Sequence, residues 1–256
     1  MCHALDALPP IAPLAGAAVD SRDLTLTSAD GTQFAAFLAR SAKPGSPGIV
    51  VLPDVRGLYR FYEELALRFA EHGLNAVAID YFGRTAGVGK RDEAFPFMEH
   101  VMQTRADTIS ADVGAAVAYL GSPDGGSSSA VFTVGFCFGG ANSWLQAASG
   151  HSLAGVIGFY GRPGAGRDGS PGPQQRAAEF KAPVLALMGG ADQSIPQDQV
   201  GEYEQALKSA GVEHEVVVYP GAPHSFFDRS ADQHADAAAD AWQRALDFVA
   251  KHSRKA

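Results

Sequence analysis

Cysteine is rare in this sequence: Cys2 and Cys137 are the only two among 256 residues. Because one of them lies at the extreme terminus, we expect no disulfide between them, and this usage fits a protein of the reducing cytoplasm. Long apolar runs are also missing, since none approaches the roughly 20 residues that a membrane-spanning helix needs. The first residues lack the basic segment that opens a signal peptide. We therefore predict a cytoplasmic protein with no membrane partner.

Basic residues are outnumbered by acidic ones, 20 against 28, and the formal net charge is −8. This balance excludes a general attraction to nucleic acid or to anionic membranes, although a local arginine can still bind a small anion. Cys2 and His3 are adjacent, but structural zinc needs four ligands. We predict neither a bound metal nor another cofactor.

The sequence does contain a regular alternation of short apolar runs and longer helical patterns. The turn signal ADGT predicts a hairpin over 23–28 and 33–40. Buried strands are predicted over 48–54, 75–80, 130–136, 153–161, 182–190 and 213–221, and helices over 61–73, 105–123, 138–150, 197–211 and 232–252. This alternation is typical of a mainly parallel sheet with helices on both faces.

The length favours a single α/β domain over residues 1–256. Residues 1–22, which include three prolines, are predicted to form an irregular arm. The segment GRPGAGRDGSPGPQQR at 161–176 is dense in Gly and Pro, and we expect no regular structure there. The sequence does not decide between a monomer and a dimer.

The stretch VFTVGFCFGG places Cys137 between Gly135 and Gly139, where a predicted strand meets a predicted helix. A catalytic nucleophile can lie on such a sharp turn, which needs small residues two positions away on each side. The helix N-terminus supplies N–H groups and a positive dipole end, and both favour a thiolate and an oxyanion. The alternative is that Cys137 is an inert core thiol.

Two further candidates follow Cys137, each just past a predicted strand. Asp192 lies in VLALMGGADQSIP and His224 in VVVYPGAPHSFFD. Nucleophile, acid and histidine occur in this order in α/β enzymes with a strand–nucleophile–helix turn, and the carboxyl ends of parallel strands bind ligands. We therefore predict a Cys–His–Asp triad. The alternatives are that Asp192 only forms a turn and that His224 is a surface residue.

These segments resemble the dienelactone hydrolase (carboxymethylenebutenolidase) family of the α/β-hydrolase fold. The matching pieces are GFCFGG, MGGADQSIP, APHSFFDR, LPDVRG and IDYFGRTAG, spread over roughly residues 45–250. The resemblance implies Cys137, Asp192 and His224 as the triad. We expect the oxyanion to be held by two backbone N–H groups, those of Phe138 and Val55.

The resemblance implies roles for neighbouring charged residues as well. Asp54 stands where the family has a glutamate that pairs with the resting thiol, or else it only shapes its loop. Arg84 matches an arginine that contacts a substrate carboxylate; the alternative is a surface arginine. A second family arginine is replaced by Asp228, with Arg229 next to it. Arg56 stands where an apolar residue is more usual, so we expect anion binding to move towards it.

Aromatic residues on the predicted strand-end loops are candidates either for lining a pocket or for core packing. They are Tyr59, Tyr81, Phe82, Tyr160 and Phe226. Trp144 is predicted to lie in the core.

The predicted function is cysteine-dependent hydrolysis of an enol lactone such as dienelactone, giving maleylacetate through a thioester, in the degradation of aromatic compounds. A thiolate leaves more easily than an alkoxide, so a stabilised leaving group is expected in a small, anionic substrate. One alternative is a broader carboxylesterase for small aryl or acyl esters. Another is a non-catalytic binding or redox-sensing protein that uses the thiol of Cys137.

Overall fold

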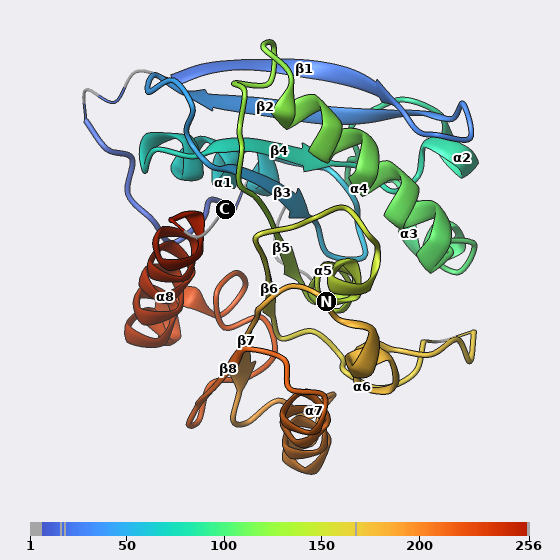
Figure 1. Ribbon diagram of the computed structural model, residues 1–256, viewed down its shortest axis with the longest axis vertical. Coiled ribbons are helices and arrows are strands. Elements are labelled where there is room, and N and C mark those ends of the chain that lie inside the picture. Colours follow the sequence, from blue (N-terminus) through green and yellow to red (C-terminus); the bar gives the residue numbers. More distant parts are fainter. Residues whose placement is uncertain (1–6, 16, 18, 167, 255–256) are drawn as a thin grey trace. The chain divides into compact units, whose positions relative to one another are not determined.

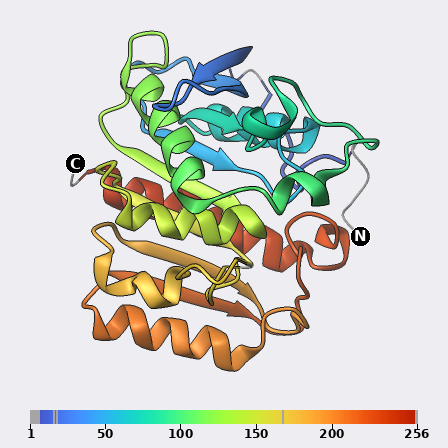
Figure 2. The same ribbon diagram turned by 90° about the vertical axis from the view of Figure 1, so that its right-hand side faces the viewer.

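The strand–helix alternation sets the architecture of the computed structural model, which describes residues 7–15, 17, 19–166 and 168–254. Cys2 and His3 lie outside these residues. The chain divides into two units, Met1–Phe132 and Thr133–Ala256, which contain the blue-to-green and the green-to-red ribbon of Figures 1 and 2. Each unit is described by itself, and the single domain stays a prediction.

The strands of the first unit follow the order β1-β2-β4-β3. Their bounds are β1 (Val19–Thr27), β2 (Gln33–Ser41), β3 (Gly48–Leu52) and β4 (Asn75–Ile79). The predicted hairpin is confirmed, and β2 also pairs antiparallel with β4, while β3 and β4 are parallel. The irregular arm was predicted to reach residue 22, which is wrong from Val19 onwards, because Val19 already pairs with Ser41.

The described residues of this unit form the helices α1 (Arg60–Glu71), α2 (Gly83–Ala86), α3 (Phe97–Val101) and α4 (Ala106–Gly121). α1 packs on β2 and β4, and α4 packs on β3 and β4. The two helices cover opposite faces of these strands (Figure 1). The sequence did not predict α2 or α3, because helices of four or five residues are too short to show a helical period.

The strands of the second unit follow the order β5-β6-β7-β8. They are β5 (Val131–Phe136, starting in the last two residues of the first unit), β6 (Gly155–Phe159), β7 (Val184–Gly189) and β8 (His214–Tyr219). β6, β7 and β8 are parallel neighbours. The helices are α5 (Phe138–Leu145), α6 (Pro173–Arg176), α7 (Gln197–Ser209) and α8 (Ala235–Ser253), with 3-10 turns η1 (Gln146–Ala148), η2 (Ala177–Glu179) and η3 (Ala231–Gln233).

Helices flank the strands of this unit on both sides, with α8 on one side and α6 and α7 on the other (Figure 1). The predicted mainly parallel sheet between helices is thus confirmed. The absence of regular structure over 161–176 was wrong for its last residues. There, Pro173 opens α6, and the Gly172 N–H donates to Gln175 Oε1 at 2.9 Å, so both ends of the turn are held.

Trp144 anchors the core of the second unit, as predicted, and is fully buried. Its indole N–H donates to Leu185 O at 3.1 Å. A Cβ on Gly158 would lie 2.4 Å from the indole, so only glycine leaves room for this ring on β6. The ring packs on Tyr203 of α7 with 5.0 Å between centroids.

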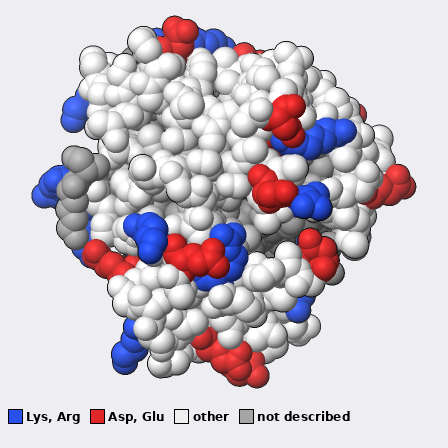
Figure 3. Space-filling model, turned by 45° about the vertical axis from the view of Figure 1, so that its right-hand side comes forward, with Lys and Arg blue, Asp and Glu red and all other residues white. Residues whose placement is uncertain are grey.

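Within the described residues, no helix combines the length and the apolarity needed to cross a membrane. On the face drawn in Figure 3, acidic and basic side chains lie next to one another and do not gather by sign. The net negative charge therefore produces no continuous acidic patch on that face.

Candidate active site

Cys137 lies on the turn between β5 and α5, with φ 55° and ψ −113°. Residues other than glycine rarely adopt a positive φ, and such strain is found where the surrounding structure enforces it, often at functional sites. Here the Cys137 N–H donates to Phe159 O at 3.0 Å, and Cys137 O accepts the N–H of Gly140 at 3.0 Å. These bonds tie the turn to β6 on one side and to α5 on the other.

Glycines provide the clearance for this turn. A Cβ on Gly135 would lie 1.9 Å from Gly139 O, and a Cβ on Gly140 would lie 2.7 Å from Phe159 O. Both obstructing atoms are backbone atoms, which cannot move aside as a side chain end can. The sequence pattern predicted the need for Gly135; the contact of Gly140 with β6 was not foreseen.

A second pair of glycines brings the acid loop and the histidine loop together. A Cβ on Gly189 would lie 2.6 Å from Ala222 O, and one on Gly190 would lie 2.8 Å from Tyr219 O. Because both positions are glycine and carry no Cβ, the two loops come close enough to form hydrogen bonds. The Gly190 N–H donates to Tyr219 O at 2.8 Å, and the Ala191 N–H donates to Ala222 O at 2.9 Å. Asp192 and His224 follow directly on these contacts.

The two oxygens of the Asp192 carboxylate have different partners. Oδ2 accepts from His224 Nδ1 at 2.6 Å. Oδ1 accepts from the Ser194 N–H at 2.8 Å, from Ser194 Oγ at 2.7 Å and from the Ile195 N–H at 3.2 Å. Burial raises the pKa of Asp192, but the hydrogen bonds from His224 and Ser194 outweigh it and leave the pKa lowered. Asp192 is thus an anchored, buried anion.

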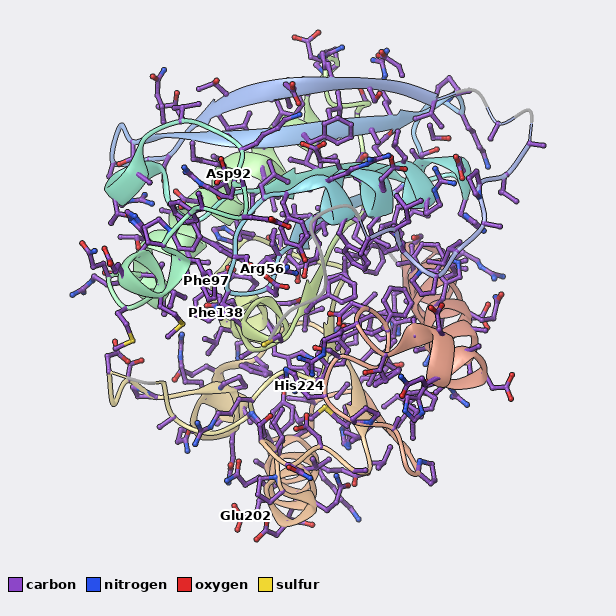
Figure 4. The ribbon with its side chains drawn as sticks, turned by 180° about the vertical axis from the view of Figure 1, so that it is seen from behind. Arg56, Asp92, Phe97, Phe138, Glu202 and His224 are labelled. Atoms are coloured by element: carbon purple, nitrogen blue, oxygen red, sulfur yellow. The ribbon has the colours of Figure 1, made fainter. Side chains whose placement is uncertain are left out.

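His224 interacts with both other members of the predicted triad. Burial alone would lower its pKa, but hydrogen bonds and electrostatic interactions with the Asp192 and Cys137 side chains raise the pKa from 6.5 to about 10. An imidazole with this pKa is protonated at neutral pH. The structure therefore brings the side chains of Asp192 and Cys137 to the same imidazole, that of His224. Figure 4 labels His224 and Phe138, the first residue of α5.

Tyr160 lies against the imidazole, with 5.1 Å between its ring centroid and that of His224. It is fully buried and has a φ of 38°, a second strained residue at a strand end. Its hydroxyl donates to Asp228 Oδ2 at 2.9 Å. Phe226 is also fully buried and packs on Tyr160 at 5.5 Å. Both rings thus have core packing contacts, one of the two roles predicted for them.

The predicted residues of the first unit form a cluster in the turn after β3. The Asp54 carboxylate accepts from the Arg56 N–H at 2.8 Å, from Arg56 Nη2 at 2.8 Å and from the Tyr59 hydroxyl at 3.2 Å. The Arg56 guanidinium also bonds to the Tyr59 hydroxyl and lies 4.1 Å from the centre of that ring. These contacts agree with a role of Asp54 in shaping its loop, and its pairing with a thiol stays a prediction. Within the described chain, the Val55 N–H makes no hydrogen bond.

Arg84 has contacts that the resemblance did not predict. Its Nη1 and Nη2 donate to the two oxygens of the buried Asp112 at 2.7 and 2.9 Å, and its Nε donates to Asp30 at 2.9 Å. Nη2 also donates to Ser28 Oγ at 3.1 Å. Arg84 thus ties the β1–β2 turn to α4. These contacts give Arg84 structural partners inside the protein. Its contact with a substrate carboxylate stays a prediction.

Two other predicted pocket aromatics, Tyr81 and Phe82, are buried, and the Tyr81 hydroxyl donates to Pro53 O at 2.7 Å. No group of three His, Cys, Asp or Glu side chains among the described residues is arranged to hold a metal ion. Ser194 was missed by the sequence reasoning. A serine two residues after the candidate acid is a turn-forming signal that could have marked it.

Comparisons with known proteins match this geometry to one family. The profile of the family described as "Dienelactone hydrolase family" matches residues 34–253. The chain is 31% identical over 96% of both sequences to a Salmonella typhimurium protein named "Putative carboxymethylenebutenolidase". It is 27% identical to a Bradyrhizobium protein named "Probable 2-oxo-3-(5-oxofuran-2-ylidene)propanoate lactonase", over 87% of this chain and 91% of that protein.

A solved structure from Klebsiella pneumoniae, titled as a "Putative Dienelactone Hydrolase", superposes with a TM-score of 0.81 at 31% identity and covers 91% of this chain and 99% of its own. A metagenomic protein titled "Dienelactone Hydrolase-like Promiscuous Phospotriesterase P91" shares the fold, with a TM-score of 0.76 at 24% identity over 92% of this chain and 99% of its own. The predicted α/β-hydrolase fold is confirmed, and the chain belongs to the dienelactone hydrolase family, a family of hydrolases.

Proposed function

We propose that this hydrolase cleaves activated esters and lactones with Cys137 as nucleophile, His224 as acid and base, and Asp192 as the residue that orients His224. The observation that carries the proposal is the contact set of His224. Its Nδ1 lies 2.6 Å from a buried carboxylate oxygen, and its ring also bonds to a thiol on a strained turn. A structural histidine has no need of a strained cysteine as its neighbour.

The proposed reaction has two stages. The Cys137 sulfur attacks the carbonyl carbon, an S–C bond forms, and the carbonyl electron pair moves to the oxygen. The backbone N–H groups of Phe138 and Val55 are proposed to hold that oxyanion. The intermediate collapses, the C–O bond to the leaving group breaks, and His224 gives that oxygen its proton. His224 then takes a proton from water, which attacks the thioester and releases the acid and the thiolate.

Sulfur as nucleophile limits the substrate. A thiolate is a better leaving group than an alkoxide, so the adduct of a simple alkyl ester returns to reactants. Enol lactones and aryl esters have stabilised leaving groups, so their adducts go on to the thioester. Dienelactone, an enol lactone, is the first candidate substrate, and the name of the Bradyrhizobium relative also describes an ylidene lactone. The anionic character of the substrate stays a prediction.

A second candidate is a broader carboxylesterase acting on small aryl or acyl esters. The bonds of Arg84 to Asp112 and Asp30 favour it, because they occupy the arginine predicted to contact a substrate carboxylate. The relative kcat/KM on cis- and trans-dienelactone and on a panel of p-nitrophenyl esters separates the two candidates.

The test of the chemistry common to both is mass spectrometry during turnover of a p-nitrophenyl ester. We expect one acyl group on Cys137 in the wild type, none after alkylation with iodoacetamide, and none in Cys137→Ala. Full activity of Cys137→Ala would overturn the proposal.

A further inference from the structure

Ser194 contacts two members of the proposed triad at once. Its Oγ lies 2.7 Å from Asp192 Oδ1 and 3.3 Å from His224 Nδ1. A hydroxyl has a single proton to donate, and the shorter contact to a carboxylate takes it. Toward His224, Ser194 Oγ can therefore only accept. The Nδ1 proton faces two acceptors, Asp192 Oδ2 at 2.6 Å and Ser194 Oγ at 3.3 Å.

We infer that Ser194 is a positioning residue of the triad: it holds Asp192 Oδ1 so that Oδ2 faces His224, and it accepts a share of the Nδ1 proton. This inference rests on the proposed function. It assigns Ser194 no contact with the reacting atoms. Its effect reaches Cys137 only through Asp192 and His224.

The geometry of the carboxylate explains why such a residue is useful. Rotation about the last bond of an Asp side chain is soft, with two broad preferred orientations. Three donors on Oδ1 fix that oxygen, and Oδ2 is left for the imidazole. Two of these donors are backbone N–H groups of the turn, from Ser194 and Ile195. The third, Ser194 Oγ, is the only one that a substitution can remove without changing the turn.

The groups that face His224 come from three strand ends of the second unit. Asp192 follows β7, Cys137 follows β5, and Tyr160 follows β6, with Asp228 bonded to the Tyr160 hydroxyl. Among these groups, the one that Ser194 contacts is Asp192. Removing the Ser194 hydroxyl takes away one acceptor of the Nδ1 proton and one donor that fixes Asp192. We therefore expect a less stable imidazolium and an alkaline limb of the activity profile at lower pH.

The test compares Ser194→Ala and Ser194→Thr with the wild type, using p-nitrophenyl acetate from pH 6 to pH 11. For Ser194→Ala we expect kcat to fall about five- to thirty-fold with KM within about twofold, since one charge-assisted hydrogen bond is lost and two donors remain. We also expect its alkaline limb to move down by at least about half a pH unit. Ser194→Thr keeps the hydroxyl and should stay within about threefold of the wild type.

Ser149→Ala is the matched control, because Ser149 also donates through Oγ at 2.7 Å, but to Gln146 O. It should leave kcat and the pH profile unchanged. A loss in Ser194→Ala that is uniform in pH, with an unmoved alkaline limb, would overturn the inference, and so would wild-type kinetics in that variant. Cys137→Ala in the same assay separates failure of the inference about Ser194 from failure of the proposed function. If Cys137→Ala is active, the proposed function fails, whatever the Ser194 variants show.

Discussion

Asp192→Asn is the substitution whose outcome the structure constrains most tightly. Three hydrogen-bond donors surround the position of Asp192 Oδ1: the N–H and the Oγ hydroxyl of Ser194 and the N–H of Ile195. An asparagine must put its single oxygen there, because an amide NH2 cannot accept these bonds. Its NH2 then takes the place of Oδ2 and points at Nδ1 of His224. The imidazole is forced to carry its proton on Nε2, where it cannot take a proton from the thiol.

The size of the effect follows from the charge and from the tautomer. The pKa of His224 rises from 6.5 to about 10 in the fold, a net stabilisation of the imidazolium of roughly 5 kcal/mol, to which Asp192 and Cys137 contribute and which burial opposes. Asp192→Asn removes one of the groups that stabilise the imidazolium, while burial still lowers the pKa of His224. The alkaline limb of the activity profile, which follows that pKa, should therefore fall below about pH 8. The wrong tautomer should lower kcat/KM by about 10³- to 10⁴-fold, as in other triads.

The assay is hydrolysis of p-nitrophenyl acetate from pH 6 to pH 11, with the free energy of unfolding measured in parallel. Asp198→Asn, in the exposed first turn of α7, makes the same chemical change away from the triad and should leave both quantities unchanged. If Asp192→Asn keeps more than about a tenth of the activity with its alkaline limb near pH 10, the role given to Asp192 is wrong.

Three further outcomes are expected. Cys137→Ser should lose most activity on enol lactones and aryl esters, because a serine hydroxyl is far less acidic than a thiol and does not form the anion that attacks the carbonyl; equal kcat/KM would contradict this. Gly135→Ala should lower the free energy of unfolding by about 2 kcal/mol or more in a urea titration, since its Cβ would lie 1.9 Å from Gly139 O; an unchanged midpoint would show that the turn relaxes. Tyr160→Phe keeps the ring against His224 and loses the bond to Asp228, so we expect about 1 kcal/mol less stability with kcat within about tenfold; a kcat loss beyond 100-fold would give the hydroxyl a catalytic role.

The sequence predicted the elements that carry the site because strand ends leave a clear signal. Each of Cys137, Asp192 and His224 follows a short apolar run, and parallel strands bring such ends to one edge. The structure places Asp192 and His224 in contact, as that reasoning expected. The observed bounds differ from the predicted ones where strand pairing decides them. β1, for example, starts at Val19 because Val19 pairs with Ser41 at the end of β2.

The partners of polar side chains could not be predicted in the same way. Ser194 adds nothing to a hydrophobic period, and its importance depends on a carboxylate orientation that only the folded turn defines. The partners of Arg84 come from positions 30 and 112, which no local pattern connects to position 84. The sequence showed Tyr160 only as an aromatic residue at the end of a predicted strand. Its strained backbone and its bond to Asp228 arise from tertiary contacts.

The ion pairs of the first unit bear on the charge of the substrate. Arg84 and Arg56, the two arginines predicted to bind a substrate anion, each contact a buried carboxylate of the protein, Asp112 and Asp54. Removing an arginine from such a pair leaves an uncompensated buried charge, which costs about 3–5 kcal/mol. A substrate carboxylate would have to repay that cost before it gained anything. The ion pairs therefore oppose the predicted binding of a substrate anion by these two arginines. Comparing kcat/KM on dienelactone with kcat/KM on its methyl ester tests whether the substrate has to carry a carboxylate.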